Sequence, residues 1–149
     1  PNIAYCEGRM YQGVGYDKYF ATCYFNSGFE VEWATAEAMC QAQGYDGLAS
    51  ISNQLEHEFV DYSTSGLGLD YASWIGFTDQ NSYSSEGNFV WSNGDDSLYT
   101  SWNSGEPNDA NGEDCVEMIP MESGATLDRW NDLSCSDTRD LICSKTFLD

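Results

Sequence analysis

The sequence has little positive charge. Its 149 residues include five Lys and Arg against 25 Asp and Glu, which gives a formal net charge of −20 at pH 7. Such a field repels phosphate backbones and anionic lipid headgroups, so we expect no nucleic-acid partner and no membrane insertion. It favours cations instead, and carboxylates are ligands that Ca²⁺ prefers. The simpler alternative is that the charge keeps the protein soluble.

Residues typical of zinc, redox and membrane proteins are scarce too. The chain has one histidine, His57, and no Cys-x-x-Cys pair, which argues against zinc and thiol redox chemistry. No nucleophile is evident near His57 in the sequence, so we expect this histidine to be structural or exposed and the protein not to be an enzyme. No apolar run is long enough to span a bilayer. Pro1 begins no signal peptide, so we expect a mature, secreted, extracellular form.

Six cysteines are present: Cys6, Cys23, Cys40, Cys115, Cys135 and Cys143. An even number predicts disulfides formed in an oxidising compartment, although the spacing alone leaves their pairing open. Hydrophobic residues make up 41% and aromatic residues 15% of the chain, which is enough for a folded core. We expect one domain over residues 1–149.

Two helices are predicted in the first half of the chain. Residues 32–44 are rich in alanine, with Ala36 and Cys40 on one face and Gly44 as a natural stop. Asn53-Gln-Leu-Glu56 has the character of a capping box, and Leu55, Phe59 and Tyr62 follow it at helical spacing, to about residue 65.

Short runs typical of strands precede and follow these helices. They lie at residues 19–25, 48–51, 74–77, 89–91, 115–119 and 141–143. Long polar stretches separate the later runs, and such loops in a compact domain are usually functional. The pattern predicts an α+β fold.

Two of the polar stretches carry most of the candidate ligands. Residues 102–115 contain Glu106, Asn108, Asp109, Glu113 and Asp114, and Trp130-Asn-Asp132 follows shortly before Cys135. A disulfide between Cys115 and Cys135 would hold the two stretches together. Mixed carboxylate and amide oxygens suit Ca²⁺, whereas Mg²⁺ would retain more water.

These motifs, in this order along nearly the whole chain, resemble the C-type lectin-like domain family. The matching segments are Cys23-Tyr-Phe, the helix ending in Cys40, Trp74-Ile-Gly-Phe77, Glu86-Gly-Asn-Phe89, Gly105-Glu-Pro-Asn108, Gly112-Glu-Asp-Cys115, Trp130-Asn-Asp132 and Ile142-Cys143. The resemblance implies a C-type lectin fold with two helices, small antiparallel sheets and long calcium-binding loops. It also implies the disulfides Cys40–Cys143 and Cys115–Cys135, and Cys6–Cys23 as in the long form.

The resemblance further implies a sugar-binding calcium. Its ligands would be Glu106, Asn108, Glu113, Asn131 and Asp132, with a cis Glu106–Pro107 bond that aims the first two. A vicinal diol would bind the calcium, donate its hydroxyl protons to the carboxylates and accept from the amides. Glu-Pro-Asn implies mannose, glucose, N-acetylglucosamine or fucose, whereas galactose binding is the less favoured alternative. The glycans would be those of glycoproteins or cell surfaces, and weak single sites would favour a homo-oligomer.

An auxiliary calcium is implied at Asp79, Glu86, Asp109, Glu113 and Asp114. Two departures from the family pattern affect it: an insertion at residues 81–84, and a stretch 108–115 that is one residue short. Residues 120–129 form an enlarged loop to which the sequence assigns no role.

Two other functions compete with the lectin reading. A C-type-lectin-fold protein can bind protein, ice or a mineral surface without sugar, and an acidic secreted chain is compatible with that. A glycoside hydrolase would need one carboxyl group in an apolar pocket, whereas the carboxylates here lie in polar loops. The five tryptophans are expected to pack the core and loops.

Overall fold

The computed structural model describes residues 3–25, 30–65, 72–108, 112–119 and 130–148. It contains helices α1 (Trp33–Ala42) and α2 (Gln54–Ser65). The strands are β1 (Ile3–Gly13), β2 (Tyr16–Phe25), β3 (Gly47–Leu48), β4 (Ser73–Thr78), β5 (Val90–Trp91), β6 (Cys115–Met118), β7 (Trp130–Leu133) and β8 (Asp140–Leu148). Both expected helices are confirmed, so the α+β prediction holds.

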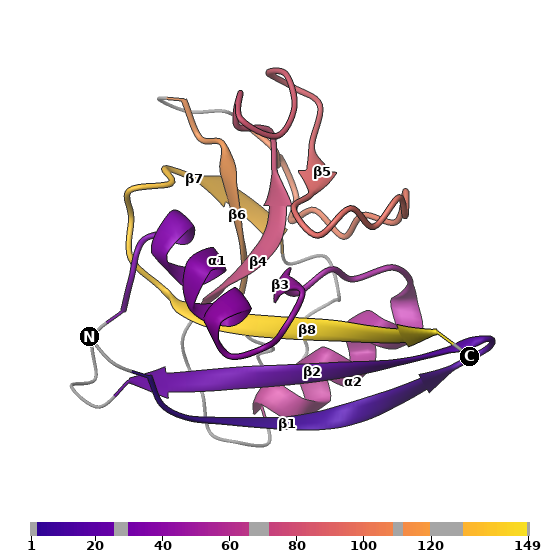
Figure 1. Cartoon of the computed structure of the whole chain (residues 1–149). Helices are drawn as coiled ribbons and strands as arrows, with labels where there is room; N and C mark the ends of the chain where they lie inside the picture. Colours follow the sequence, from indigo (N-terminus) through magenta and orange to yellow (C-terminus); the bar gives the residue numbers. More distant parts are fainter. Residues whose placement is uncertain (1–2, 26–29, 66–71, 109–111, 120–129, 149) are drawn as a thin grey trace.

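The strands form one mixed sheet with the order β1-β2-β8-β4-β6-β7, while β3 pairs with β8 and β5 with β4. The antiparallel strands β1, β2 and β8 run along one side of the molecule, and β4, β6 and β7 rise from it (Figure 1). The small antiparallel sheets expected from the sequence are therefore joined. The joint is a short parallel pairing of Ser73 and Trp74 with Asp140 and Leu141.

Three strand predictions need correction. The N-terminal segment forms the hairpin implied by the family resemblance, but its strands β1 and β2 are longer than the short strands expected from residues 19–25; Gly15, with φ +82°, allows the tight turn between them. Of the run at 48–51, Leu48 alone lies in a strand, although the backbone amide of Ala49 still donates to the Ile142 carbonyl of β8 and that of Ser50 to the Ser144 hydroxyl. Residues 130–133, interpreted as a ligand loop, form β7 against β6.

The ends of both helices agree with the sequence signals, but the buried face of α2 differs from the one that the sequence pattern suggests. Gly44 has φ +91° just beyond α1, and the Glu56 amide donates to the Asn53 side chain at 2.9 Å. Leu55, however, is 64% exposed, whereas Glu56 and His57 are buried. Glu56 is turned inward because its carboxylate binds Lys18 and the Ser52 amide.

The three disulfides Cys6–Cys23, Cys40–Cys143 and Cys115–Cys135 are all present. Cys40–Cys143 ties α1 to β8, and Cys115–Cys135 ties the start of β6 to the residues just after β7. The second bridge therefore closes the region in which the candidate ligands lie.

An aromatic cluster anchors the upper half of the core. Phe77 and Trp91 have ring centroids 4.4 Å apart, and Trp130 meets Trp91 edge to face at 5.4 Å. Phe89 and Trp102 join the cluster at 5.0 Å from each other. The tryptophans of this region thus pack, as expected, and they fix the loops that carry the candidate ligands.

Candidate functional site

The first group of candidate ligands lies where β4 ends and β6 begins. Asp79 follows β4 and Asp114 precedes β6, and because these strands are antiparallel, the two residues meet at the same edge of the sheet. The Asp79 amide donates to the Asp114 carbonyl at 3.1 Å, and the Thr78 hydroxyl donates to the same carbonyl at 2.7 Å. The backbone therefore fixes both side chains.

A turn brings Glu86 to the same place. The amides of Tyr83 and Ser84 both donate to the Gln80 carbonyl, so the inserted residues 81–84 are taken up in a tight turn. The Gly87 amide then donates to Asp79 Oδ2 at 2.9 Å. The insertion consequently leaves Asp79 and Glu86 close together.

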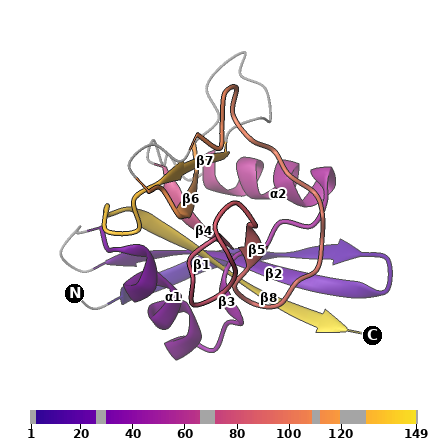
Figure 2. The ribbon, with the colours of Figure 1, turned by 90° about the horizontal axis from the view of Figure 1, so that it is seen from above.

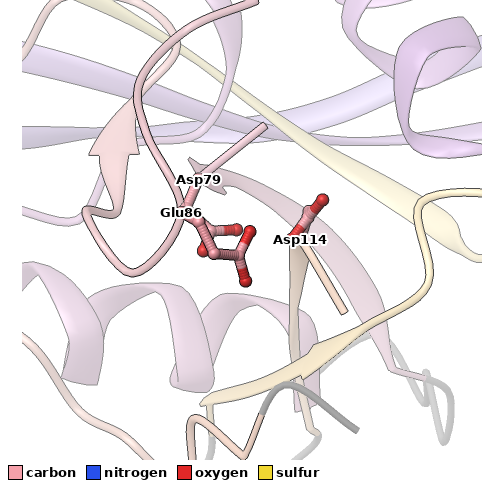
Figure 3. A group of neighbouring side chains, drawn as sticks. All are labelled: Asp79, Glu86 and Asp114. Carbon is pink, nitrogen blue, oxygen red and sulfur yellow. The ribbon is translucent and has the colours of Figure 1, made fainter. Parts of the chain in front are cut away.

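Three carboxylates converge as a result (Figure 3). One oxygen each of Asp79, Glu86 and Asp114 lies within 4.8 Å of the others. Oδ1 of Asp114 is buried and accepts no hydrogen bond from the described residues. Like charges this close repel one another unless a cation lies between them. Their hard oxygen donors fit Ca²⁺, so this cluster has the chemistry of a calcium site.

The second group of ligands is held by β7 and the loop before residue 109. The Trp130 amide donates to the Ser101 carbonyl at 2.9 Å, and the Asn103 amide donates to the Trp130 carbonyl at 2.8 Å. The Glu106 amide donates to the Asn103 carbonyl, which makes a turn directly before the cis Glu106–Pro107 bond. That cis bond was expected from the resemblance and is confirmed.

Glu106, Asn108 and Asp132 meet after this turn. The backbone amide of Asn108 donates to Asp132 Oδ1 at 3.1 Å, and the Asp132 side chain is fully buried. Oε1 of Glu106 is buried and accepts no hydrogen bond from the described part of the chain. Burial, and then the neighbouring carboxyl groups of Asp132 and Glu113, raise the pKa of Glu106 above its usual value. A cation among these groups would offset the repulsion, so they too fit calcium.

Asn131 has a different neighbour. In the β6–β7 register it lies opposite Glu117, and its Nδ2 donates to Glu117 Oε2 at 2.8 Å. Glu117 also accepts from Arg139 Nε at 2.8 Å. Sequence reasoning overlooked Glu117 and Arg139, because their relation to Asn131 depends on the strand register and is not a motif. Asp109 and residues 120–129 lie outside the described residues.

His57 is buried between aromatic rings, which is the structural one of its two expected roles. Its ring meets Trp130 edge to face at 5.8 Å, and Nδ1 lies 3.4 Å from the Tyr99 hydroxyl. Its Nε2 is 3.9 Å from a carboxylate oxygen of Asp61, four residues along α2. These contacts join α2 to the aromatic cluster.

The same arrangement of elements occurs in proteins that are already known. The sequence model of the protein family described as the lectin C-type domain matches residues 30–145 of this chain. The chain belongs to this C-type lectin domain family. Members of the family generally bind Ca²⁺ and carbohydrate and are generally not enzymes.

Three similar proteins illustrate the range of the family. Lectin BRA-3 of Megabalanus rosa is 31% identical over 145 residues, which cover 96% of this chain and 80% of the relative. Human lithostathine has a TM-score of 0.71 at 26% identity, covering 94% of this chain and 95% of its own. Herring type II antifreeze protein has a TM-score of 0.67 at 27% identity, with 94% and 97% covered. This C-type lectin domain thus has both lectins and an antifreeze protein among its relatives.

Among the described residues, no helix is long and apolar enough to cross a membrane.

Proposed function

We propose that the whole chain, residues 1–149, acts as one calcium-dependent carbohydrate-recognition domain in the extracellular space. The observation that carries the proposal is the convergence of Glu106, Asn108 and Asp132 after the cis bond. The neighbouring charge of Glu113, which raises the pKa of Glu106, adds a further carboxylate. Three disulfides support an oxidising compartment.

The proposed calcium ligands are Glu106, Asn108, Glu113, Asn131 and Asp132. When bound, the ion would supply the positive charge that draws two adjacent sugar hydroxyl oxygens. The chain's own side chains then set the orientation of the sugar. Carboxylates such as Glu106 can only accept hydroxyl protons, whereas the amides of Asn108 and Asn131 donate to the hydroxyl oxygens.

The order of acceptor and donor carries the proposed specificity. Glu106 supplies an acceptor on one side of the cis bond and Asn108 a donor on the other. By resemblance to the family, this order suits the equatorial 3- and 4-hydroxyls of mannose, glucose, N-acetylglucosamine or fucose. The partners would be glycans of glycoproteins or cell surfaces, and pairing of several weak sites in a homo-oligomer would raise avidity.

A second, auxiliary calcium is proposed at Asp79, Glu86 and Asp114, whose oxygens converge. Asp109 and Glu113 complete the proposed set. Since Asp114 lies next to Glu113 in the chain, a cation here would brace the loop that also carries a ligand of the sugar site.

The alternative function is binding of an ice or mineral surface, or of a protein, without sugar. The antifreeze relative is the observation that favours it. An intact set of sugar-site residues argues against it.

Sugar titration distinguishes the two functions. Isothermal titration with methyl α-mannoside and with methyl β-galactoside, each in calcium and in EDTA, should give heat for the mannoside in calcium alone. Heat for the galactoside alone would keep the lectin but overturn the specificity. The absence of calcium-dependent binding across a wider glycan panel would favour the alternative.

A further inference from the structure

The side chain of Glu117 connects Asn131, a proposed ligand of the sugar-site calcium, to Arg139. It lies in β6, is 6% exposed, and faces Asn131 across the β6–β7 ladder. Both of its carboxylate oxygens are used: Oε2 accepts from Asn131 Nδ2, and Oε1 accepts from Arg139 Nε, each at 2.8 Å.

Arg139 is itself held in a fixed place. Its backbone exchanges two hydrogen bonds with Val31, at 3.0 and 2.9 Å. Its guanidinium also donates from Nη1 to the Thr138 carbonyl at 2.7 Å. The guanidinium therefore reaches Glu117 from a segment just before β8 that is anchored to the residues just before α1.

This chain of contacts sets the orientation of the Asn131 amide. A carboxylate accepts hydrogen bonds and donates none, so Glu117 can take the NH₂ end of Asn131 but not its oxygen. A half-turn of the amide would bring Oδ1 against Oε2, two acceptors in contact. The amide oxygen is therefore directed away from Glu117, and one hydrogen on Nδ2 remains for a second acceptor.

We propose that Glu117 and Arg139 are positioning residues for calcium and sugar binding, which act by fixing the orientation of the Asn131 amide. The inference rests on the proposed function, in which Asn131 ligates calcium through Oδ1 and donates to the sugar through Nδ2. Groups that orient metal ligands from behind typically change metal affinity by about 10- to 100-fold when they are altered.

The test compares calcium affinities of matched variants. Glu117→Gln keeps the shape of the side chain but offers an NH₂ as well as an oxygen, so the Asn131 amide can turn over. We expect its calcium affinity to fall about tenfold. Glu58→Gln, which makes the same charge change at an exposed position on α2, should bind calcium like the wild type.

Arg139 provides a second variant that leaves Glu117 in place. Arg139→Gln should also weaken calcium binding, and Arg139→Lys, which retains the charge, should restore part of the loss. In the metal-free protein, the side-chain ¹⁵N–¹H resonances of Asn131, identified by their loss in Asn131→Asp, should move in Glu117→Gln and not in Glu58→Gln. A purely structural ion pair would lower the unfolding midpoint without altering calcium affinity.

The outcomes separate the inference from the function on which it rests. If Glu106→Ala loses the calcium-dependent binding of methyl α-mannoside, and Glu117→Gln binds calcium as the wild type does, the positioning role is overturned and the sugar site stands. If Glu106→Ala binds calcium like the wild type, the proposed function falls and the inference falls with it.

Discussion

In the lower half of the molecule, around β2 and α2, the buried carboxylate of Glu56 lies 2.8 Å from the ammonium group of Lys18, and Asp95 lies 3.6 Å from the same nitrogen. In the upper half, where β4 ends and β6 begins, Asp79, Glu86 and Asp114 lie against one another. Figure 2, seen from above, shows α1 and α2 on opposite sides of strand β8. In the lower half, the lysine ammonium group neutralises the neighbouring carboxylates. In the upper half, the converging carboxylates have the geometry to bind a cation from solution.

The pKa directions show the same contrast. Burial alone would raise the pKa of Asp95, but hydrogen bonds from Ser52 and Ser97, together with the Lys18 charge, hold it below its usual value. For Glu106, burial and the carboxyl groups of Asp132 and Glu113 act in the same direction and raise the pKa. An acid beside a cation is most favourable when ionised, whereas carboxylates that lie close together resist ionisation until a cation binds.

Removing the internal cation should have the largest effect on stability. Lys18→Met leaves the carboxylate of Glu56 buried without its partner, so we expect a loss of about 3–5 kcal/mol in the free energy of unfolding. Denaturant unfolding in EDTA, with the disulfides intact, measures it. Lys145→Met, at a less buried lysine, is the matched control, and an equal loss in the two variants would break the comparison.

Removing a carboxylate from the proposed sugar site should weaken calcium binding without lowering the stability of the metal-free protein. Glu106→Ala relieves crowding in the metal-free protein, so its unfolding free energy should not fall. We expect its calcium affinity, measured by titration, to drop by at least about 100-fold, the upper end of the range for altered metal surroundings. Glu58→Ala is the control. Unchanged calcium affinity in Glu106→Ala would contradict the assigned ligand.

Acidification should release calcium and sugar together. Protons compete with calcium for the ligating carboxylates, and the raised pKa of Glu106 places this competition at a higher pH than for an ordinary glutamate. Affinity should fall by about tenfold per pH unit for each proton taken up. Parallel calcium and mannoside titrations from neutral pH down into the carboxylate range measure this. Sugar retained after calcium has left would refute the model.

In EDTA, the raised pKa of Glu106 has the opposite consequence: acidification should stabilise the metal-free protein. Because the folded metal-free protein holds the Glu106 proton more tightly than the unfolded chain does, acidification through the raised pKa should favour the folded state. Paired Asp95 works the other way, since its lowered pKa contributes stability that is lost as the pH falls. Comparing the pH dependence of unfolding in Glu106→Ala with that of the wild type isolates the first contribution, and identical profiles would argue against it.

The smallest effect is expected at the auxiliary cluster. Asp114→Asn removes one charge with little change in shape, and its buried Oδ1 is one of the converging atoms. We expect one fewer bound calcium, with mannoside affinity in saturating calcium reduced by less than about tenfold, or 1.4 kcal/mol. Loss of sugar binding altogether would show that the two proposed calcium sites act as one.

Much of the fold could be predicted because its signals are local. The helix over residues 33–42, the stop at Gly44 and the Asn53 cap each depend on a few neighbouring residues. The disulfides and the cis Glu106–Pro107 bond followed from the family resemblance, and both are present. The convergence of Asp79, Glu86 and Asp114 also agrees with the expected auxiliary set.

The features that could not be predicted depend on long-range pairing. Helical spacing places Leu55 on the same face as Phe59, yet Leu55 is exposed and Glu56 is buried. Glu56 can be buried because Lys18 on β2 forms an ion pair with its carboxylate. The role of Glu117 depends on the β6–β7 register, which no single segment specifies. Motifs predicted the candidate ligands, whereas the neighbours of those ligands could be found in the fold alone.

A crystal structure of the protein grown with calcium and methyl α-mannoside would test the central claim most directly. It should show one calcium bound by Glu106, Asn108, Glu113, Asn131 and Asp132, two adjacent sugar hydroxyls on that ion, and Asn131 still donating to Glu117. A sugar bound away from any calcium, or a calcium that does not contact Glu106, would contradict the account.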